Sequence, residues 1–123
     1  MIETLLLSPA GNPDAGMGEW QLMTEADLLT PAPRERNAML YQSAEGDPRI
    51  VKIGVWECEA YAEQMTNYPY DEYMRVIEGS VTITAIGGEA KTYTVGDSFF
   101  MPKGFTGIWQ QTETMKKYFA IYG

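Results

Sequence analysis

Short strand-like segments separated by turn residues at regular intervals dominate the chain from about residue 37 onward. The segments are rich in Val, Ile, Thr, Tyr, Phe and Trp, which favour strands. They cover residues 39–42, 50–57, 73–77, 81–86, 91–95, 98–101, 106–111 and 116–122. Gly87-Gly88 is a typical hairpin turn, and Gly96-Asp97 closes another segment. This spacing predicts an all-β sandwich or barrel.

The region before these segments has a different character. Pro and Gly residues interrupt residues 1–19 repeatedly, which predicts an irregular arm. Thr24-Glu25-Ala26-Asp27 resembles a helix capping box, so we expect a short helical turn that ends before Pro31. We therefore divide the single domain into an N-terminal arm and packing segment, residues 1–36, and a β-barrel, residues 37–123.

Charge excludes two classes of partner. The 123-residue chain carries 17 acidic and 9 basic residues, a formal net charge of −8. Such a field repels phosphate backbones, so we expect no nucleic-acid partner. It repels anionic membrane surfaces in the same way, so we expect no membrane partner.

The single cysteine, Cys58, excludes an internal disulfide. A lone thiol is typical of a reducing compartment. The first residues lack the basic n-region of a signal peptide, and no apolar run has membrane-spanning length. These features predict a cytoplasmic protein.

Two stretches resemble the paired motifs of the cupin superfamily. Glu72 is followed by six residues and Gly79, as at the end of the first motif. Gly96 is followed by five residues and Pro102-Lys103-Gly104, as in the second. The resemblance implies a cupin-type jelly-roll barrel, a double-stranded β-helix. Gly79 and Gly96 suit the positive φ angles of tight turns between strands.

Residues 50–122 resemble one cupin branch in particular. Gly54-Val55-Trp56-Glu57-Cys58, Tyr68-Pro69-Tyr70-Asp71-Glu72 and the segment from Gly96 to Phe105 are similar to ureidoglycine aminohydrolase-like and ethanolamine-utilisation cupins. The branch implies nitrogen metabolism, with hydrolytic deamination or related carbon–nitrogen chemistry.

The histidines that hold a metal in many cupins are missing, because the chain has no histidine. The first two ligand positions fall on Thr66 and Tyr68, or on Met65 and Asn67, and the third falls on Gly107. Only Glu72 stands at a ligand position. Transition-metal sites need about three or four protein ligands, so we expect no metal and no other cofactor.

Glu72 is the candidate catalytic residue and the centre of a candidate ligand pocket. Glu72, Met74 and Val76 share one strand face, which has a polar head and an apolar floor. Alternatively, Glu72 lies at the surface or forms a salt bridge with Arg75 or Lys103. The candidate ligand-binding residues are Trp56, Cys58, Tyr68, Glu72, Met74, Phe100 and Trp109.

Several of these residues have a second interpretation. Trp56 and Trp109 either stack on a ligand at the cavity mouth or fill the core. Tyr68 either offers a hydroxyl to the pocket or lies at its rim. Cys58 is expected to be inert packing, because a catalytic thiol normally needs a base such as histidine. Lys116 and Lys117 are expected to be solvated.

Three functions fit these features. The first is metal-independent binding of a small polar molecule near Glu72. The second is a small metabolic enzyme, a carbon–nitrogen hydrolase, lyase or isomerase, with Glu72 as base and a tyrosine as acid. The third is a structural or regulatory partner, in which the N-terminal segment joins a neighbour's sheet. A homodimer is expected.

Overall fold

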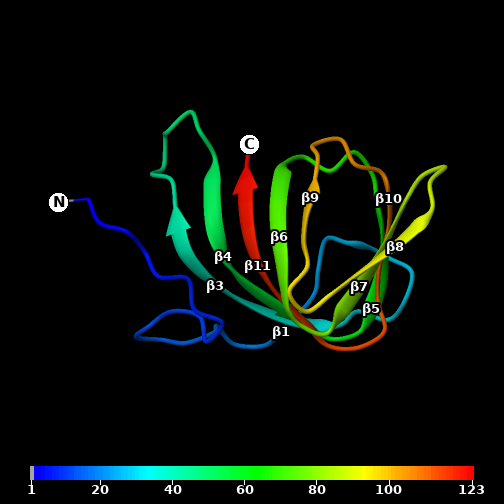
Figure 1. Ribbon diagram of the computed structural model, residues 1–123, viewed down its shortest axis with the longest axis horizontal. Helices are drawn as coiled ribbons and strands as arrows, with labels where there is room; N and C mark the ends of the chain where they lie inside the picture. Colours follow the sequence, from blue (N-terminus) through cyan, green and yellow to red (C-terminus); the bar gives the residue numbers. More distant parts are fainter. Residues whose placement is uncertain (1) are drawn as a thin grey trace.

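The computed structural model describes residues 2–123, and these form strands, turns and loops without a helix (Figure 1). The strands are β1 (Gln21–Leu22), β2 (Asp27–Leu28), β3 (Arg34–Gln42), β4 (Val51–Cys58), β5 (Tyr61–Met65), β6 (Asp71–Glu78), β7 (Ser80–Ala85), β8 (Ala90–Thr94), β9 (Ser98–Met101), β10 (Gly107–Gln111) and β11 (Met115–Tyr122). The predicted all-β class is confirmed.

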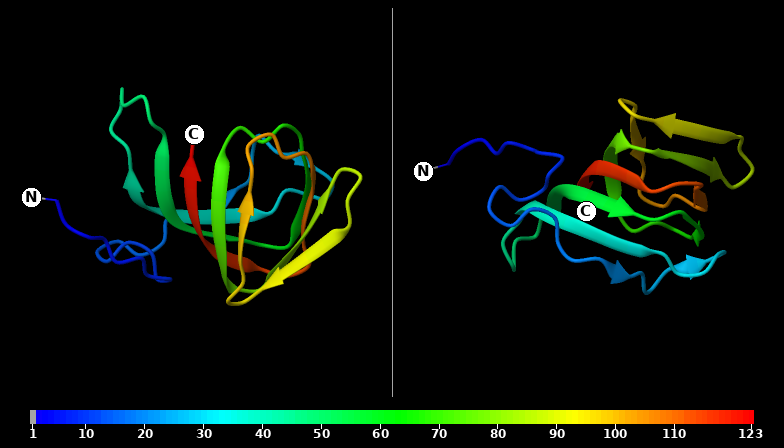
Figure 2. Two further views of the ribbon diagram at one scale, coloured as in Figure 1. Left: turned by 45° about the horizontal axis from the view of Figure 1, so that its top comes forward. Right: turned by 90° about the horizontal axis from the view of Figure 1, so that it is seen from below.

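Two antiparallel sheets face each other (Figures 1 and 2). The six-stranded sheet has the order β1-β3-β4-β11-β6-β9, and the five-stranded sheet has the order β2-β5-β10-β7-β8. Neighbouring strands in space are often distant in sequence, as β4, β11 and β6 are. The chain therefore crosses repeatedly between the sheets, which is the connectivity of a jelly roll.

The hydrophobic core lies between the sheets. In β6, Met74 and Val76 are buried while the alternating residues Tyr73 and Arg75 are exposed, because successive strand residues point to opposite faces. Trp109 of β10 and Met115 of β11 are 1% and 0% exposed. Arg75 thus lies on the face opposite Glu72.

The helical turn predicted around Thr24 is wrong. Strands β1 and β2 flank this segment, and they pair with β3 and β5 respectively. The Met23 amide donates to the Pro33 carbonyl at 2.8 Å, and the Leu29 amide donates to the Ala62 carbonyl at 2.9 Å. Glu25 has a φ of 60°, which no right-handed helix accepts. Strand pairing with β3 and β5 therefore outweighs the local capping pattern.

The segment before β1 lies against β3 and β11. The Gly18 amide donates to the Asn37 carbonyl at 2.9 Å, and the Tyr118 hydroxyl donates to the Leu7 carbonyl at 3.2 Å. The expected boundary between residues 36 and 37 falls inside β3, which begins at Arg34.

Strand β5 was not predicted. Its sequence, Tyr61-Ala62-Glu63-Gln64-Met65, has polar residues at its centre and resembles a loop. It becomes a strand because β10 pairs with it over its whole length. Tyr61 and Glu63 of this strand line the cavity between the sheets.

The described chain, residues 2–123, holds no helix with the length and apolar character needed to cross a membrane.

Two turn glycines of the motifs adopt the predicted positive φ angles, 73° at Gly79 and 90° at Gly96. Their surroundings differ. A Cβ at Gly79 would lie 2.3 Å from the Thr114 carbonyl oxygen, whereas a Cβ at Gly96 would meet no atom within 4 Å. Gly79 is therefore required both by its positive φ and by the close Thr114 carbonyl, whereas Gly96 is required by its positive φ alone.

We expect Gly79→Ala to destabilise the fold by at least about 3 kcal/mol, because backbone strain and a steric clash add. Gly96→Ala is the matched control and should cost only about 1 kcal/mol, from the strained φ alone. Urea unfolding followed by tryptophan fluorescence measures both. Equal losses would contradict the role assigned to the Thr114 contact.

Candidate functional site

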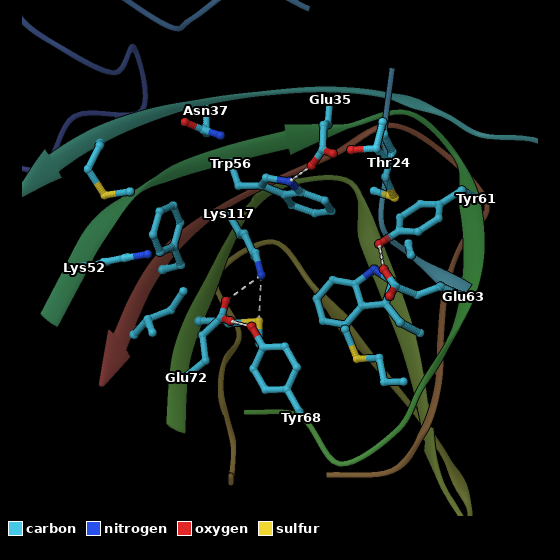
Figure 3. A pocket seen from close by; sticks show the side chains of 18 residues that line it. Thr24, Glu35, Asn37, Lys52, Trp56, Tyr61, Glu63, Tyr68, Glu72 and Lys117 are labelled. Atoms are coloured by element: carbon cyan, nitrogen blue, oxygen red, sulfur yellow. Dashed lines mark hydrogen bonds and ion pairs between the residues drawn. The ribbon is translucent and has the colours of Figure 1, made fainter. Parts of the chain in front are cut away.

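A cavity of about 380 Å³ lies between the sheets, against the inner face of the six-stranded sheet (Figure 3). Strands β3, β4, β6 and β11 supply one wall, and β5 and β10 supply the other. Its labelled polar and aromatic side chains are Thr24, Glu35, Asn37, Lys52, Trp56, Tyr61, Glu63, Tyr68, Glu72 and Lys117. The volume suits a small molecule.

A buried ion pair stands at the centre of one wall. Lys117 Nζ of β11 lies 2.8 Å from Glu72 Oε2 of β6, and the two side chains are 9% and 4% exposed. The Tyr68 hydroxyl donates a hydrogen bond to the other carboxylate oxygen, Glu72 Oε1. Both oxygens of Glu72 are therefore engaged (Figure 3).

Aromatic rings surround the Lys117 ammonium. Its Nζ lies 4.9 Å from the centre of the Trp56 ring and 4.8 Å from the centre of the Trp109 ring. It also lies 3.0 Å from Met74 Sδ. Cation–π attraction offsets part of the cost of burying the charge.

Two further carboxylates face another part of the cavity. Glu35 accepts a hydrogen bond from the Trp56 indole N–H at 2.8 Å, and Glu63 accepts one from the Tyr61 hydroxyl at 2.5 Å. Neither carboxylate forms a salt bridge within residues 2–123. In Figure 3, Tyr61 and Glu63 lie at the right of the cavity, and Glu35 lies at the top beside Trp56 and Thr24.

Burial shifts the acidity of several of these groups. Burial raises the pKa of Glu63, and the charge of Glu35 raises it further, while the Tyr61 hydrogen bond acts in the opposite direction. Burial and the adjacent carboxylates raise the pKa values of Tyr61 and Tyr68 well above the ordinary range. Both phenols are hydrogen-bond donors at neutral pH.

Five of the seven candidate ligand-binding residues line this cavity: Trp56, Tyr68, Glu72, Met74 and Trp109. Cys58 is 0% exposed within the core and does not line it. Phe100 is 56% exposed and lines a separate groove with Tyr93 and Phe105. Phe100 lies outside because it alternates with the buried Phe99 along β9.

The expected solvation of Lys117 is wrong, and it is Lys117 that pairs with Glu72, in place of Arg75 or Lys103. The sequence of β11 contains a signal for the burial of Lys117. Lys117 shares the alternation of Met115 and Phe119, which are both buried. Lys116, the neighbour that points to the other face, is half-buried.

Sequence reasoning also missed Glu35, Tyr61 and Glu63 as cavity residues. Tyr61 and Glu63 lie on β5, for which the sequence predicted no strand. Glu35 lies on β3 before the expected start of the barrel. Only the pairing of distant strands brings them to the cavity.

Gln111 fixes one wall of the cavity. Its Oε1 accepts the Trp109 indole N–H at 2.9 Å, and its Nε2 donates to the Cys58 carbonyl at 3.0 Å. Gln111 is 3% exposed, so its partners are all within the protein. The Trp109 ring is thereby held in place beside Lys117.

Comparison with known proteins agrees with this architecture. The model of the EutQ-like cupin domain matches residues 46–119. The chain belongs to this family. No curated protein sequence is significantly similar to this cupin.

Solved structures share the cupin fold. A protein of unknown function from Pseudomonas syringae pv. tomato matches with a TM-score of 0.75 and 23% identity, over 94% of this chain and 46% of that one. EutQ from Clostridium difficile matches with a TM-score of 0.61 and 23% identity, over 80% of each chain. A putative ethanolamine utilisation protein Q from Salmonella typhimurium matches with a TM-score of 0.65 and 16% identity, over 97% and 92%. This cupin thus spans about half of the Pseudomonas protein, and the predicted jelly-roll fold is confirmed.

The residues of this cupin do not fit the metal ion that many cupins hold. Glu72, the one carboxylate at a ligand position, is already bonded to Lys117 and Tyr68. Thr66 and Asn67 are exposed, and Gly107 has no side chain. Within residues 2–123, no three His, Cys, Asp or Glu side chains are grouped as a metal site. The Lys117 ammonium is the cation that Glu72 binds.

We expect Lys117→Met to destabilise the cupin by about 3 kcal/mol, because it leaves Glu72 buried without its counter-charge. A double variant, Glu72→Leu with Lys117→Met, should recover most of the loss, since both charges are removed together. Urea unfolding measures the two values.

Lys116→Met is the control for this pair, because Lys116 is the adjacent residue and forms no salt bridge among the described residues. It should change stability by no more than about 0.5 kcal/mol. A double variant less stable than Lys117→Met would show that the pair is not the source of the loss.

Cys58 should resist thiol reagents in the folded protein. Burial, followed by the charges of Glu35, Glu59 and Glu63, raises the pKa of its thiol to about 12. The folded thiol is therefore neutral at pH 8, and the stability that it contributes is lost only as the pH rises from about 9 towards 12. We expect no labelling by dithionitrobenzoate at pH 8 and full labelling in urea. Rapid labelling without urea would contradict the assignment of Cys58 to the core.

Proposed function

We propose that this cupin binds a small polar molecule in the cavity beside Glu72, without the histidine metal site that many cupins have. The observation that carries the proposal is a cavity of about 380 Å³ whose walls combine charged side chains with two indole rings. Pockets of this kind bind small molecules through apolar contacts, with a few fixed polar groups that set orientation.

The buried ion pair supports a binding role for the polar wall. An ammonium has three N–H donors, and Glu72 and Met74 account for two of the contacts of Lys117. Lys117 and Tyr68 both line the cavity. Since Glu72 bonds both of them, little ordering is needed when a ligand binds.

A second candidate function is catalysis, as a carbon–nitrogen hydrolase, lyase or isomerase. One observation favours it: Tyr68, Glu72 and Lys117 form a continuous hydrogen-bonded chain of titratable groups beside the cavity. In this proposal Glu72 is the catalytic residue that accepts a proton from the substrate, and Tyr68 donates one. The expected homodimer and cytoplasmic location stay predictions.

Thermal-shift screening tests the binding proposal. Ureido compounds, hydroxy acids, amines and sugars are tested separately, with and without Mn²⁺ or Mg²⁺. A ligand at about 100 times its dissociation constant should raise stability by about 2.7 kcal/mol, several degrees for a domain of this size. We expect a shift that needs no metal and disappears in Glu72→Gln.

The matched control is Glu78→Gln, since Glu78 lies on the same strand but is exposed. It should keep the shift. A shift that requires metal would contradict the proposal, and turnover of the ligand that depends on Glu72 would favour the enzyme instead.

A further inference from the structure

The carboxylates of the cavity are of two kinds, and this difference bears on the ligand of the proposed function. Glu72 has a cationic partner, Lys117, at 2.8 Å. Glu35 and Glu63 are held by uncharged donors instead, the indole of Trp56 and the hydroxyl of Tyr61. Each donor engages one oxygen and leaves the carboxylate charge unneutralised.

Burial makes the charge of Glu63 costly. Glu35 and Glu63 are both partly buried, and burial together with the neighbouring Glu35 charge raises the pKa of Glu63. Like charges removed from water are stabilised most by a cation placed between or beside them. A ligand with a positive charge would supply it.

The cations of the cavity meet this need only in part. Lys117 forms its salt bridge with Glu72, and its charge lowers the pKa of Glu63 without a salt bridge to that carboxylate. Lys52 lines the opposite side of the cavity from Glu63 and Tyr61 in Figure 3. An anionic ligand would meet the charges of Glu35 and Glu63, in a protein whose net charge is −8. The field of the cavity therefore favours positive ligands.

We propose that the cavity selects a small organic cation, a protonated primary amine, and that Glu35 and Glu63 bind its ammonium group. Charge-assisted hydrogen bonds to the two carboxylates recognise the N–H groups. The carbon body packs on the apolar wall, where Met65 and Trp109 lie. Glu72, which the sequence singles out, is already occupied by Lys117.

Three probes of equal size isolate the sign of the charge: n-butylammonium, n-butanol and n-butyrate at pH 7. The readout is the set of indole N–H signals in a nitrogen-15 NMR titration. The Trp56 indole donates to Glu35 and so reports binding directly. Trp20 packs on Arg36 outside the cavity and serves as an internal control.

We expect n-butylammonium to shift the Trp56 signal, leave the Trp20 signal in place, and bind about tenfold or more tightly than n-butanol. n-Butyrate should bind least. Glu35→Gln and Glu63→Gln each keep an oxygen that accepts the existing hydrogen bond but remove the charge. Each should weaken amine binding about tenfold and leave n-butanol binding unchanged.

Glu113→Gln is the control for net charge, because it changes the total by the same amount at an exposed turn. It should bind n-butylammonium as the unmodified protein does. Tighter binding of n-butanol or n-butyrate would overturn the inference while leaving the proposed binding function in place. If none of the three probes moves the Trp56 signal and the broader screen also fails, both the inference and the proposed function are overturned.

Discussion

The ion pair between Glu72 and Lys117 is the interaction on which the interior of this cupin depends. Two charges buried to this degree are stable only when they form an ion pair with each other and when the remaining carboxylate lone pairs accept hydrogen bonds. Tyr68 supplies such a donor, and Trp56 and Trp109 surround the ammonium. The pair thereby joins β6 to β11 and fixes the side chains that form one wall of the cavity.

The same pair explains how the fold keeps a polar interior without the histidines that hold a metal in many cupins. A buried carboxylate needs a positive charge close by. In this chain a lysine from the neighbouring strand provides it, so the charge is part of the sequence and is present whenever the protein is folded. The aromatic rings around Lys117 have a structural role here as well as lining the cavity, and Gln111 holds one of them in place.

The polarity of the cavity is unevenly distributed as a result. One side holds a neutralised pair, and the other holds Glu35 and Glu63 with uncharged partners. Strand β5 brings Tyr61 and Glu63 to this side by pairing with β10. The two cavity carboxylates that lack a salt bridge are therefore not at the motif positions of the family.

The sequence by itself determined the all-β class, the turn positions and the inward face of β6, because these depend on alternation and on glycine φ angles between near neighbours. Five of the residues that it suggested for a pocket, Trp56, Tyr68, Glu72, Met74 and Trp109, line one cavity, and their role in binding stays a prediction. Only the tertiary structure decided that Lys117 pairs with Glu72 and that Glu35 and Glu63 share the cavity. It also decided that the segment 21–28 holds two short strands, β1 and β2, in place of a helical turn. These features depend on pairing between segments far apart in the chain. The local sequence pattern does not show which distant strand will form the backbone hydrogen bonds of a segment or supply the counter-charge of a buried side chain.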